Sequence, residues 1–364
     1  MIAALEKLWW REEEPALAEA WLWPLTGLSL GYRIGNAAHA ALRKPWRAQA
    51  PVISVGNLAV GGAGKTPVAL LLCEELRRRG RRPALLSRGY GARTREAVTW
   101  VCRGGGPLVD AAAAGDEPLL CAARAPWLLV LAGPSRRLLA LAACEAGADV
   151  LVLDDGLQHH ALWRDLDVVV ADATNPLGNR RRLPRGPLRE GPEALARLGA
   201  RGLLWLTGAD GPPSAQTARL IAVAAQAGLA GPVRSSFVTA GPEALQLRGA
   251  RVVLLSGIAR PERFHAQVRA LGAEVRATLD HGDHHWFSAA ELASARALAS
   301  REGARLVTTE KDAARLGPDA LALGALVLRG EAQIRSGSDL LAAALDRVLA
   351  EERDAPVGAP GTPP

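Results

Sequence analysis

One stretch of the chain, residues 56–66, limits the possible folds more than any other. It reads GNLAVGGAGKT and lies between an apolar run, Val52–Val55, and a helical pattern, Thr66–Arg79. Glycines allow backbone N–H groups to approach phosphate oxygens closely, and the N-terminus of the following helix adds partial positive charge. This order of strand, loop and helix predicts a nucleotide-phosphate loop. The alternative is an ordinary glycine-rich turn.

The end of this loop carries the side chains with chemical roles. Lys65 is placed to reach the β- and γ-phosphates, and the hydroxyl of Thr66 is placed to ligate Mg²⁺. The loop departs from the usual pattern at one position, because Ala59 stands where a glycine is expected five residues before Gly64. The paired glycines that follow are expected to supply the missing backbone freedom. The residues predicted to contact the nucleotide are Gly61, Gly62, Ala63, Gly64, Lys65 and Thr66.

A second apolar run ends in two carboxylates. Val150–Leu153 is followed directly by Asp154 and Asp155, about 90 residues after the glycine-rich loop. In a phosphate-loop enzyme, an aspartate at this place helps to hold Mg²⁺, directly or through water. Alone, such a pair is more often a turn or a helix cap. Together with the loop, it predicts that Thr66, Asp154 and Asp155 serve Mg²⁺.

The sequence favours ATP over GTP. A GTPase would be expected to carry an Asn/Thr-Lys-x-Asp element. The nearest string, TEKD at 309–312, has the wrong spacing. We therefore expect ATP as the nucleotide.

Short apolar runs alternate with helical patterns from Pro51 onward. Such alternation predicts an α/β fold with a mostly parallel sheet flanked by helices. With the phosphate loop, it predicts a P-loop NTPase-type domain over 51–210 and a second, smaller α/β domain over 211–354. The Gly/Pro-rich tail, 355–364, is expected to be disordered. The predicted strands are Val52–Val55, Ala84–Ser87, Leu128–Leu131, Val150–Leu153, Val168–Ala171, Leu203–Leu206, Val252–Leu255 and Leu306–Thr308, and the predicted helices include Thr66–Arg79, Arg136–Ala146 and Ala290–Glu302.

Tryptophan is concentrated at the start of the chain. The sequence has 10 Trp against 3 Phe and 2 Tyr, and half of the tryptophans lie in the first 46 residues. Residues 1–50 predict an N-terminal amphipathic helical segment that is interrupted at Pro24. Tryptophans beside basic residues suit a helix at a membrane interface, and the alternative is a helical hairpin packed on the protein's own surface. The five tryptophans are Trp9, Trp10, Trp21, Trp23 and Trp46.

Charge and composition narrow the class of protein. The formal net charge of +7 favours acidic partners, although a solvated arginine-rich surface would explain it equally well. The four cysteines lack disulfide or zinc spacing, which indicates buried thiols in a reducing compartment. The sequence predicts neither a signal peptide nor a spanning helix, so we expect a cytoplasmic protein. Arginine runs and aromatics are not interleaved as in an RNA-binding motif, which disfavours nucleic acid.

Eight short motifs occur in an order that resembles one known family. They are GNLAVGGAGKTP (56–67), LSRGYG (86–91), GDEPL (115–119), DDGLQH (154–159), LPRGPLRE (183–190), SGI (256–258), DHH (283–285) and TTEKD (308–312). Together they closely resemble the tetraacyldisaccharide 4′-kinase family, the lipid A 4′-kinases of Gram-negative bacteria. The resemblance runs from about residue 20 to about residue 330.

This resemblance implies a reaction and its setting. The γ-phosphate of ATP would pass to the 4′-hydroxyl of a tetraacylated glucosamine disaccharide 1-phosphate, giving lipid IVA in lipid A biosynthesis. It implies ATP and Mg²⁺ as cofactors and an inner-membrane lipid surface as a partner, with the enzyme peripheral on the cytoplasmic face. No obligate protein partner is inferred. The N-terminal tryptophans would then carry a soluble kinase body to its lipid substrate.

The resemblance also implies roles for single residues. Asp116 matches the family's catalytic base, although the sequence alone favours a helix N-cap. His284 matches the histidine that works with this aspartate, and Lys65 completes the catalytic set. Contact between Asp116 and His284, about 170 residues apart, is a prediction about the fold. The residues expected to face the substrate are Tyr90, Arg88, Gln158, His159, Arg189 and Glu190.

Two other functions are consistent with the phosphate loop. A P-loop kinase or ATP-dependent ligase for a soluble metabolite would use Lys65, Thr66 and Asp154 equally well, but it leaves the N-terminal tryptophans unexplained. A nucleotide-switched binding protein at a membrane would hydrolyse or exchange nucleotide. It would give Asp116 and His284 no role.

Overall fold

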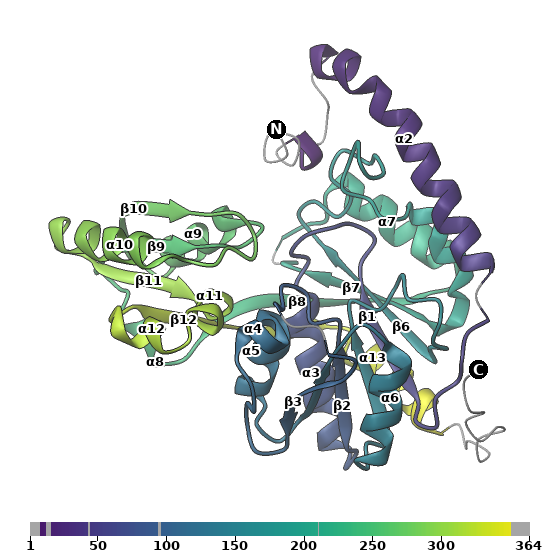
Figure 1. The fold of residues 1–364 in the computed structure, drawn as a ribbon. Helices are drawn as coiled ribbons and strands as arrows, with labels where there is room; N and C mark the ends of the chain where they lie inside the picture. The colour runs from purple at the N-terminus through teal and green to yellow at the C-terminus, as the bar shows by residue number, and fades with distance from the viewer. Residues whose placement is uncertain (1–7, 12–15, 43, 94–95, 210, 351–364) are drawn as a thin grey trace. The chain divides into compact units, whose positions relative to one another are not determined.

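The computed structural model describes residues 8–11, 16–42, 44–93, 96–209 and 211–350 (Figure 1). The chain divides into two compact units. The first unit takes its described residues from Met1–Leu86, Arg136–Ser236 and Ile334–Pro364, and the second from Ser87–Ser135 and Phe237–Gln333.

The predicted domains were continuous stretches, 51–210 and 211–354, whereas each compact unit joins separate parts of the chain. Residues 87–135 lie with residues beyond 236, and the last helix returns to the first unit. The predicted domain boundary stays a prediction. The predicted disordered tail, 355–364, lies outside the described residues.

The first unit is built on parallel strands in the order β8-β7-β6-β1-β5-β2, and every neighbouring pair in this order is parallel. The five strands from β7 to β2 are buried over almost their whole length, as expected for apolar runs that are covered on both faces. The bounds are β1 Val52–Gly56, β2 Pro83–Ser87, β5 Val150–Asp154, β6 Leu166–Asp172, β7 Gly202–Thr207 and β8 Ala230–Ala240.

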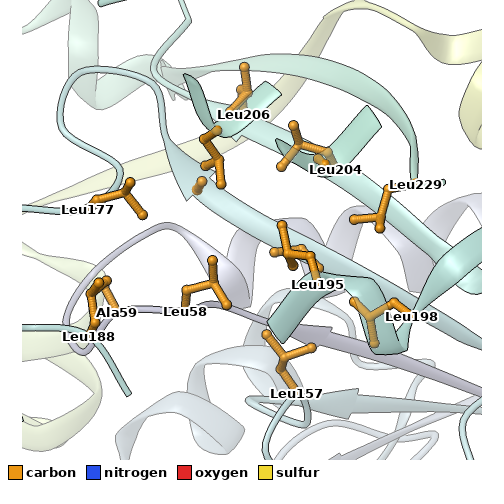
Figure 2. Packing of buried hydrophobic residues seen from close by; sticks show 14 residues of the cluster. Leu58, Ala59, Leu157, Leu177, Leu188, Leu195, Leu198, Leu204, Leu206 and Leu229 are labelled. Atoms are coloured by element: carbon orange, nitrogen blue, oxygen red, sulfur yellow. The ribbon is translucent and has the colours of Figure 1, made fainter. Parts of the chain in front are cut away.

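Apolar side chains pack on both faces of this sheet. On one face, Val169 of β6 and Leu204 of β7 join a buried cluster with Leu220 of α7. Figure 2 shows this cluster, with Leu204 among the labelled residues. Val168 is also fully buried and, because side chains alternate along a strand, faces the opposite side. The helices of this unit are α2 Ala16–Ala41, α3 Lys65–Arg78, α6 Arg136–Glu145, α7 Ala215–Gln226 and α13 Ser338–Ala350, with short 3₁₀ turns η1 Pro192–Arg197 and η2 Gly199–Arg201.

The second unit contains a parallel group of strands in the order β10-β9-β11-β12 and an antiparallel pair, β3 and β4. The strand bounds are β3 Thr99–Arg103, β4 Leu129–Ala132, β9 Arg251–Ser256, β10 Glu274–Asp280, β11 Arg305–Thr309 and β12 Leu326–Ser336. The helices are α4 Ala111–Ala114, α5 Asp116–Arg124, α8 Pro242–Leu245, α9 Pro261–Ala270, α10 Ala289–Arg301, α11 Glu310–Leu316 and α12 Pro318–Ala322.

All the predicted strands are confirmed within one or two residues at each end, as are the three predicted helices. The α/β class with a mostly parallel sheet is therefore confirmed. The sequence reading missed β3, β8, β10 and β12. In β10, exposed and half-buried residues alternate along Glu274–Asp280, so the strand has no continuous apolar run to mark it.

The predicted interruption at Pro24 is wrong, because α2 continues through this residue. A proline inside a helix removes one backbone hydrogen bond and costs about 3 kcal/mol. The next turn is anchored to the first unit. Ser29 Oγ donates to the Arg182 carbonyl at 3.0 Å, and Arg185 Nη1 donates to Thr26 Oγ1 at 2.6 Å. These bonds help to offset the lost backbone bond.

Three of the five N-terminal tryptophans contact the first unit itself. Trp9 Nε1 donates to a backbone carbonyl at 3.1 Å, Trp10 packs against the cluster of Figure 2, and Trp46 forms an isolated β-bridge. For these three, the structure supports packing on the protein's own surface. Trp23 of α2 is 70% exposed, and the side chain of Trp21 lies outside the described part of the chain.

Helix α2 exposes several apolar side chains. Leu28, Leu30 and Ile34 are each more than half exposed, in addition to Trp23. None of the helices in the described ranges combines the length and apolar character that crossing a bilayer requires. The part of residues 1–50 that the structure describes is therefore mainly one long helix with exposed apolar residues.

Candidate active site

The glycine-rich loop joins β1 to α3, as predicted. Gly64 caps α3 with φ 82° and Gly61 has φ 94°, both in the left-handed region that glycine adopts without strain. Lys65 Nζ lies 3.4 Å from Asn57 Oδ1 and 3.6 Å from Asp155 Oδ1. The ammonium group is thus held inside the loop by oxygen atoms that phosphate oxygens can replace.

Ala59 occupies the position where a glycine was expected, and the structure explains why alanine fits. Its φ is not in the left-handed region, so a Cβ atom causes no strain there. Ala59 forms an antiparallel bridge with Leu188, and both side chains belong to the buried cluster of Figure 2. Next to it, Val60 N donates to the Pro187 carbonyl at 2.8 Å. The first half of the loop is therefore held to residues 187–188 by an isolated β-bridge.

Thr66 and Asp154 meet at the start of α3 and the end of β5. Thr66 Oγ1 donates to Asp154 Oδ2 at 3.1 Å, and Asp154 is 3% exposed. Hydroxyl and carboxylate oxygens are the ligands that Mg²⁺ prefers, together with water and phosphate. The donor atoms of Thr66, Asp154 and the adjacent Asp155 therefore fit a Mg²⁺ ion that is bound beside a nucleotide.

Asp155 is paired with two cations. Arg189 Nη1 donates to both carboxylate oxygens of Asp155, at 2.8 and 2.9 Å. Lys65 Nζ lies 3.6 Å from one of the same oxygens, Oδ1. Burial alone would raise the pKa of Asp155, but Lys65 and Arg189 outweigh burial and lower the pKa to about 2. The carboxylate is therefore ionised at neutral pH.

The predicted substrate residues of the first unit lie around the same arginine. Arg189 Nη1 donates to Gln158 Oε1 at 3.2 Å, and Gln158 Nε2 donates to Glu190 Oε2 at 3.1 Å. Gln158 Nε2 also lies 3.0 Å from the carbonyl of Asn57 in the glycine-rich loop. His159 is half-buried one residue further on. Gln158, Arg189 and Glu190 thus form one network with Asp155 and Lys65, and their contact with a substrate stays a prediction.

Asp116 and His284, which the sequence separates by 168 positions, meet in the second unit. Asp116 Oδ2 lies 2.9 Å from His284 Nδ1, and Asp116 Oδ1 accepts a hydrogen bond from Glu117 N at 2.9 Å. The N-cap of α5 is Gly115, so the N-cap interpretation of Asp116 is wrong. Asp116 is instead the first residue of the helix, with a side chain that is only 2% exposed.

Two cations beside Asp116 were not predicted from the sequence. Arg315 Nη1 lies 3.6 Å and Lys311 Nζ 4.0 Å from Asp116 Oδ2. These two residues are four positions apart on α11, so they project from the same face of the helix. Lys311 also lies 3.3 Å from Glu117 Oε1 and 3.2 Å from Asp283 Oδ1. Lys311 stands inside the TTEKD motif, which was the available signal, whereas Arg315 lies outside every motif.

Two groups lie beside Nε2 of His284, Lys311 Nζ at 3.3 Å and Asp283 Oδ2 at 3.5 Å. An ammonium group can only donate, so the shorter contact favours Nε2 as the acceptor. The proton of a neutral ring is then on Nδ1, which donates to Asp116. Burial would raise the pKa of Asp116, but the His284 hydrogen bond and the Lys311 and Arg315 charges outweigh burial and lower that pKa. Burial likewise opposes the charge of Lys311, yet Glu117, Asp116 and Asp283 raise the pKa of Lys311.

Tyr90 lies against the imidazole of His284. The two ring centroids are 5.3 Å apart and the ring of Tyr90 is largely exposed. A Cβ atom on Gly115, which has φ 84°, would lie 2.5 Å from the carbonyl oxygen of Tyr90, so only glycine permits this approach. Arg88 is exposed, and its predicted contact with phosphate stays a prediction.

Comparisons with known proteins agree with this arrangement. Residues 18–350 match the sequence profile of LpxK, tetraacyldisaccharide-1-P 4'-kinase. A tetraacyldisaccharide 4'-kinase of Anaeromyxobacter dehalogenans is 47% identical over an alignment of 382 residues. The alignment covers 100% of this chain and 100% of the relative. The tetraacyldisaccharide 4'-kinase of a Methylobacterium species is 42% identical over 328 residues, which cover 88% of this chain and 91% of the relative.

A solved structure is also similar. The crystal structure of LpxK from Aquifex aeolicus in complex with ATP matches with a TM-score of 0.67 at 25% identity, covering 91% of this chain and 99% of that chain. The profile match and the relatives at 47% and 42% identity cover most of the chain. The chain belongs to the LpxK family of tetraacyldisaccharide-1-P 4'-kinases.

Proposed function

We propose that this chain transfers the γ-phosphate of ATP to the 4′-hydroxyl of tetraacyldisaccharide 1-phosphate, giving lipid IVA in lipid A biosynthesis. Family membership supports this activity. The observation that carries it is the contact of Asp116 with His284, at 2.9 Å and beside Lys311. A sugar hydroxyl is a weak nucleophile at neutral pH, so phosphoryl transfer to it benefits from a positioned proton acceptor.

We assign ATP to the glycine-rich loop of the first unit. The backbone N–H groups of Gly61–Gly64 would hold phosphate oxygens, and Lys65 would exchange Asn57 and Asp155 for the β- and γ-phosphates. Thr66, Asp154 and Asp155 would hold Mg²⁺, which when bound neutralises charge on the same phosphates. The ATP complex of the Aquifex aeolicus relative supports the choice of nucleotide.

In the transfer step, Asp116 accepts the proton of the 4′-hydroxyl. The hydroxyl oxygen forms a bond to the γ-phosphorus while the bond from that phosphorus to the β,γ-bridging oxygen breaks, and ADP leaves. His284 and the Glu117 amide hold one carboxylate oxygen each, which fixes the carboxylate plane. Lys311 lies close enough to balance negative charge beside the carboxylate.

The disaccharide phosphate requires cations and polar groups for its recognition. Arg189, Gln158 and Glu190 form a connected set beside the glycine-rich loop. The ring of Tyr90 lies tilted against that of His284 in the second unit. We assign these residues, together with Arg88 and His159, to binding the substrate.

The acyl chains of the substrate would keep it in a lipid surface. Helix α2 exposes Trp23, Leu28, Leu30 and Ile34, which supports a peripheral contact with the cytoplasmic face of the inner membrane. The sequence suggested membrane contact for all five N-terminal tryptophans, and we assign that contact to α2 alone. Trp9, Trp10 and Trp46 serve the packing of the first unit.

The direct test is incubation of the full chain with ATP labelled in its γ-phosphate, Mg²⁺ and tetraacyldisaccharide 1-phosphate in detergent micelles. We expect label in the lipid. A folded chain that binds ATP and labels no lipid would overturn the proposal. Label transferred to a soluble sugar in a parallel incubation without the lipid would indicate a kinase for soluble metabolites. Release of labelled phosphate alone would indicate a nucleotide-switched protein.

A further inference from the structure

A second polar cluster follows β10 in the second unit, apart from the Asp116 network. It consists of His281, His285 and Glu291, and we call it the His281 cluster. His281 Nδ1 lies 3.5 Å and His285 Nε2 3.0 Å from Glu291 Oε1. One ligand atom from each residue lies within 4.8 Å of the other two. All three side chains are partly buried.

The backbone brings these side chains together. His281 follows the last residue of β10, and its N–H donates to the Ser256 carbonyl at 2.8 Å. A tight turn returns the chain, with His285 N donating to the Gly282 carbonyl at 3.2 Å. The two imidazole rings consequently stack, with centroids 4.4 Å apart and an interplanar angle of 16°. Both rings present a nitrogen atom to the same carboxylate oxygen.

Glu291 is fixed by a capping box at the start of α10. Its Oε2 accepts hydrogen bonds from Ser288 N and Ser288 Oγ, each at 2.7 Å. This leaves Oε1 directed at the two histidines. The Phe287 ring packs edge-to-face with both imidazoles, with centroids 5.3 Å from His281 and 5.2 Å from His285. Ser288, which is not one of the three residues, thus orients the carboxylate by hydrogen bonds, as commonly happens for carboxylate ligands of metal ions.

Two of the three ligand separations are near those around a tetrahedral metal ion, and the stacked imidazoles would tilt to direct both nitrogens at one ion. Zn²⁺ binds histidine nitrogen and carboxylate oxygen at about 2.1 Å, which places neighbouring tetrahedral ligand atoms about 3.4 Å apart. The two nitrogen-to-oxygen distances, 3.0 and 3.5 Å, bracket this separation. Two imidazoles and one carboxylate are a donor set that suits Zn²⁺, with a fourth position left for water. By contrast, Mg²⁺ prefers oxygen ligands alone.

We propose that His281, His285 and Glu291 bind a divalent transition-metal ion, Zn²⁺ in the first place. This site lies outside the residues that hold ATP and Mg²⁺, which belong to the first unit. The ion joins the end of β10 to the start of α10. His284 lies on the loop between them, so the metal stabilises the loop that presents this histidine to Asp116.

The alternative is a cluster held by hydrogen bonds from the histidines to Glu291 without any metal. To separate the two, we would remove metals from the full chain with a chelator, add Mg²⁺ in excess and titrate with Zn²⁺ and with Co²⁺. We expect one Zn²⁺ per chain, a rise in Tm on Zn²⁺ addition and the intense visible absorption of tetrahedral Co²⁺. No stoichiometric Zn²⁺ binding by the folded chain would overturn the proposal.

Variants identify the site. His281→Ala and Glu291→Gln should each lower Zn²⁺ affinity by about 100-fold or more and abolish the Co²⁺ absorption. Glutamine keeps an oxygen that can accept from Ser288, so Glu291→Gln is expected to fold normally. The matched control is His160→Ala, which removes a histidine from the first unit and should bind Zn²⁺ like the unaltered chain. Equal Zn²⁺ binding by His281→Ala and the unaltered chain would place the metal elsewhere and overturn the proposal.

Discussion

The Nδ1 atom of His284 lies 2.9 Å from the Oδ2 atom of Asp116 inside a single compact unit. The contact orients the carboxylate of Asp116, and the lowered pKa of Asp116 keeps that carboxylate ionised at neutral pH. The same carboxylate faces Lys311 and Arg315. In the proposed reaction, the acceptor hydroxyl would therefore meet a carboxylate that is already ionised and oriented.

Asp116→Asn keeps the shape of the side chain and removes its basicity. We expect turnover of ATP and tetraacyldisaccharide 1-phosphate to fall about 10²- to 10⁴-fold while ATP binding is retained. The matched control is Asp280→Asn, which alters another close carboxylate–histidine contact of this unit, 3.0 Å from His265. Loss of ATP binding in Asp116→Asn would show that Asp116 supports the nucleotide site and would contradict its role as the base.

Lys311→Met tests the cation that the sequence reading missed. Removing the ammonium group takes away a positive charge beside the carboxylates of Asp116 and Asp283. We therefore expect turnover to fall about 10²-fold with little change in KM for ATP. Lys44→Met, at an exposed lysine of the first unit, should behave like the unaltered chain. Unchanged turnover in Lys311→Met would mean that the ion pairs of Lys311 only stabilise the fold.

Gly115→Ala tests the turn that places Asp116. Gly115 has φ 84° and ψ 161°, a conformation that is almost restricted to glycine, and a Cβ atom would lie 2.5 Å from the Tyr90 carbonyl oxygen. We expect a loss of about 1–3 kcal/mol in the free energy of unfolding, measured with urea. Gly105→Ala, where nothing lies within 4 Å, is the control. Equal stability of both variants would show that the Gly115 turn adapts without strain.

Asp155→Asn tests the ion pairs beside the glycine-rich loop. The folded-state pKa of Asp155 is about 2, below the value of about 3.9 in an unfolded chain. The ionised form therefore adds stability that is fully present above about pH 4 and is lost as the pH falls toward 2. We expect the difference in unfolding midpoint between the unaltered chain and Asp155→Asn to shrink over this range. A difference that stays constant with pH would contradict the lowered pKa.

Trp23→Asp combined with Leu30→Asp tests the exposed face of α2. These residues are seven positions apart, about two helical turns, so they share one face. Burying a large apolar side chain contributes about 1.5–3 kcal/mol, so we expect binding to anionic vesicles to weaken about 10-fold or more per residue. Leu245→Asp, at another highly exposed leucine, is the control. Vesicle binding that survives the double change would assign membrane contact to another surface.

The strands that sequence reading found are those buried on both faces. Val52–Gly56 and Val150–Asp154 are continuous apolar runs, and such runs are visible without any knowledge of the fold. Glu274–Asp280 alternates between half-buried and exposed residues. Leu326–Ser336 likewise carries exposed charged positions, so neither segment resembles a buried strand when read alone.

The candidate site was predictable where chemistry is local. Lys65, Thr66 and Asp154 follow from a loop and a strand end that are recognised by spacing alone. The position of Arg315 depends on how α11 packs beside Asp116, and no local pattern reports packing between residues so far apart in the sequence. For the same reason, the sequence could not separate Trp9 and Trp10, which contact their own unit, from the exposed Trp23.

The bridge between Ala59 and Leu188 has a consequence for the energetics of nucleotide capture. Together with the bonds from Val60 N to Pro187 and from Arg189 N to Leu58, it holds residues 58–60, the first half of the glycine-rich loop, in place when the chain folds. Ordering a free loop costs about 1–2 kcal/mol of conformational entropy per residue. Because these residues are ordered when the chain folds, their conformational entropy is not lost on ATP binding, and the binding free energy is more favourable.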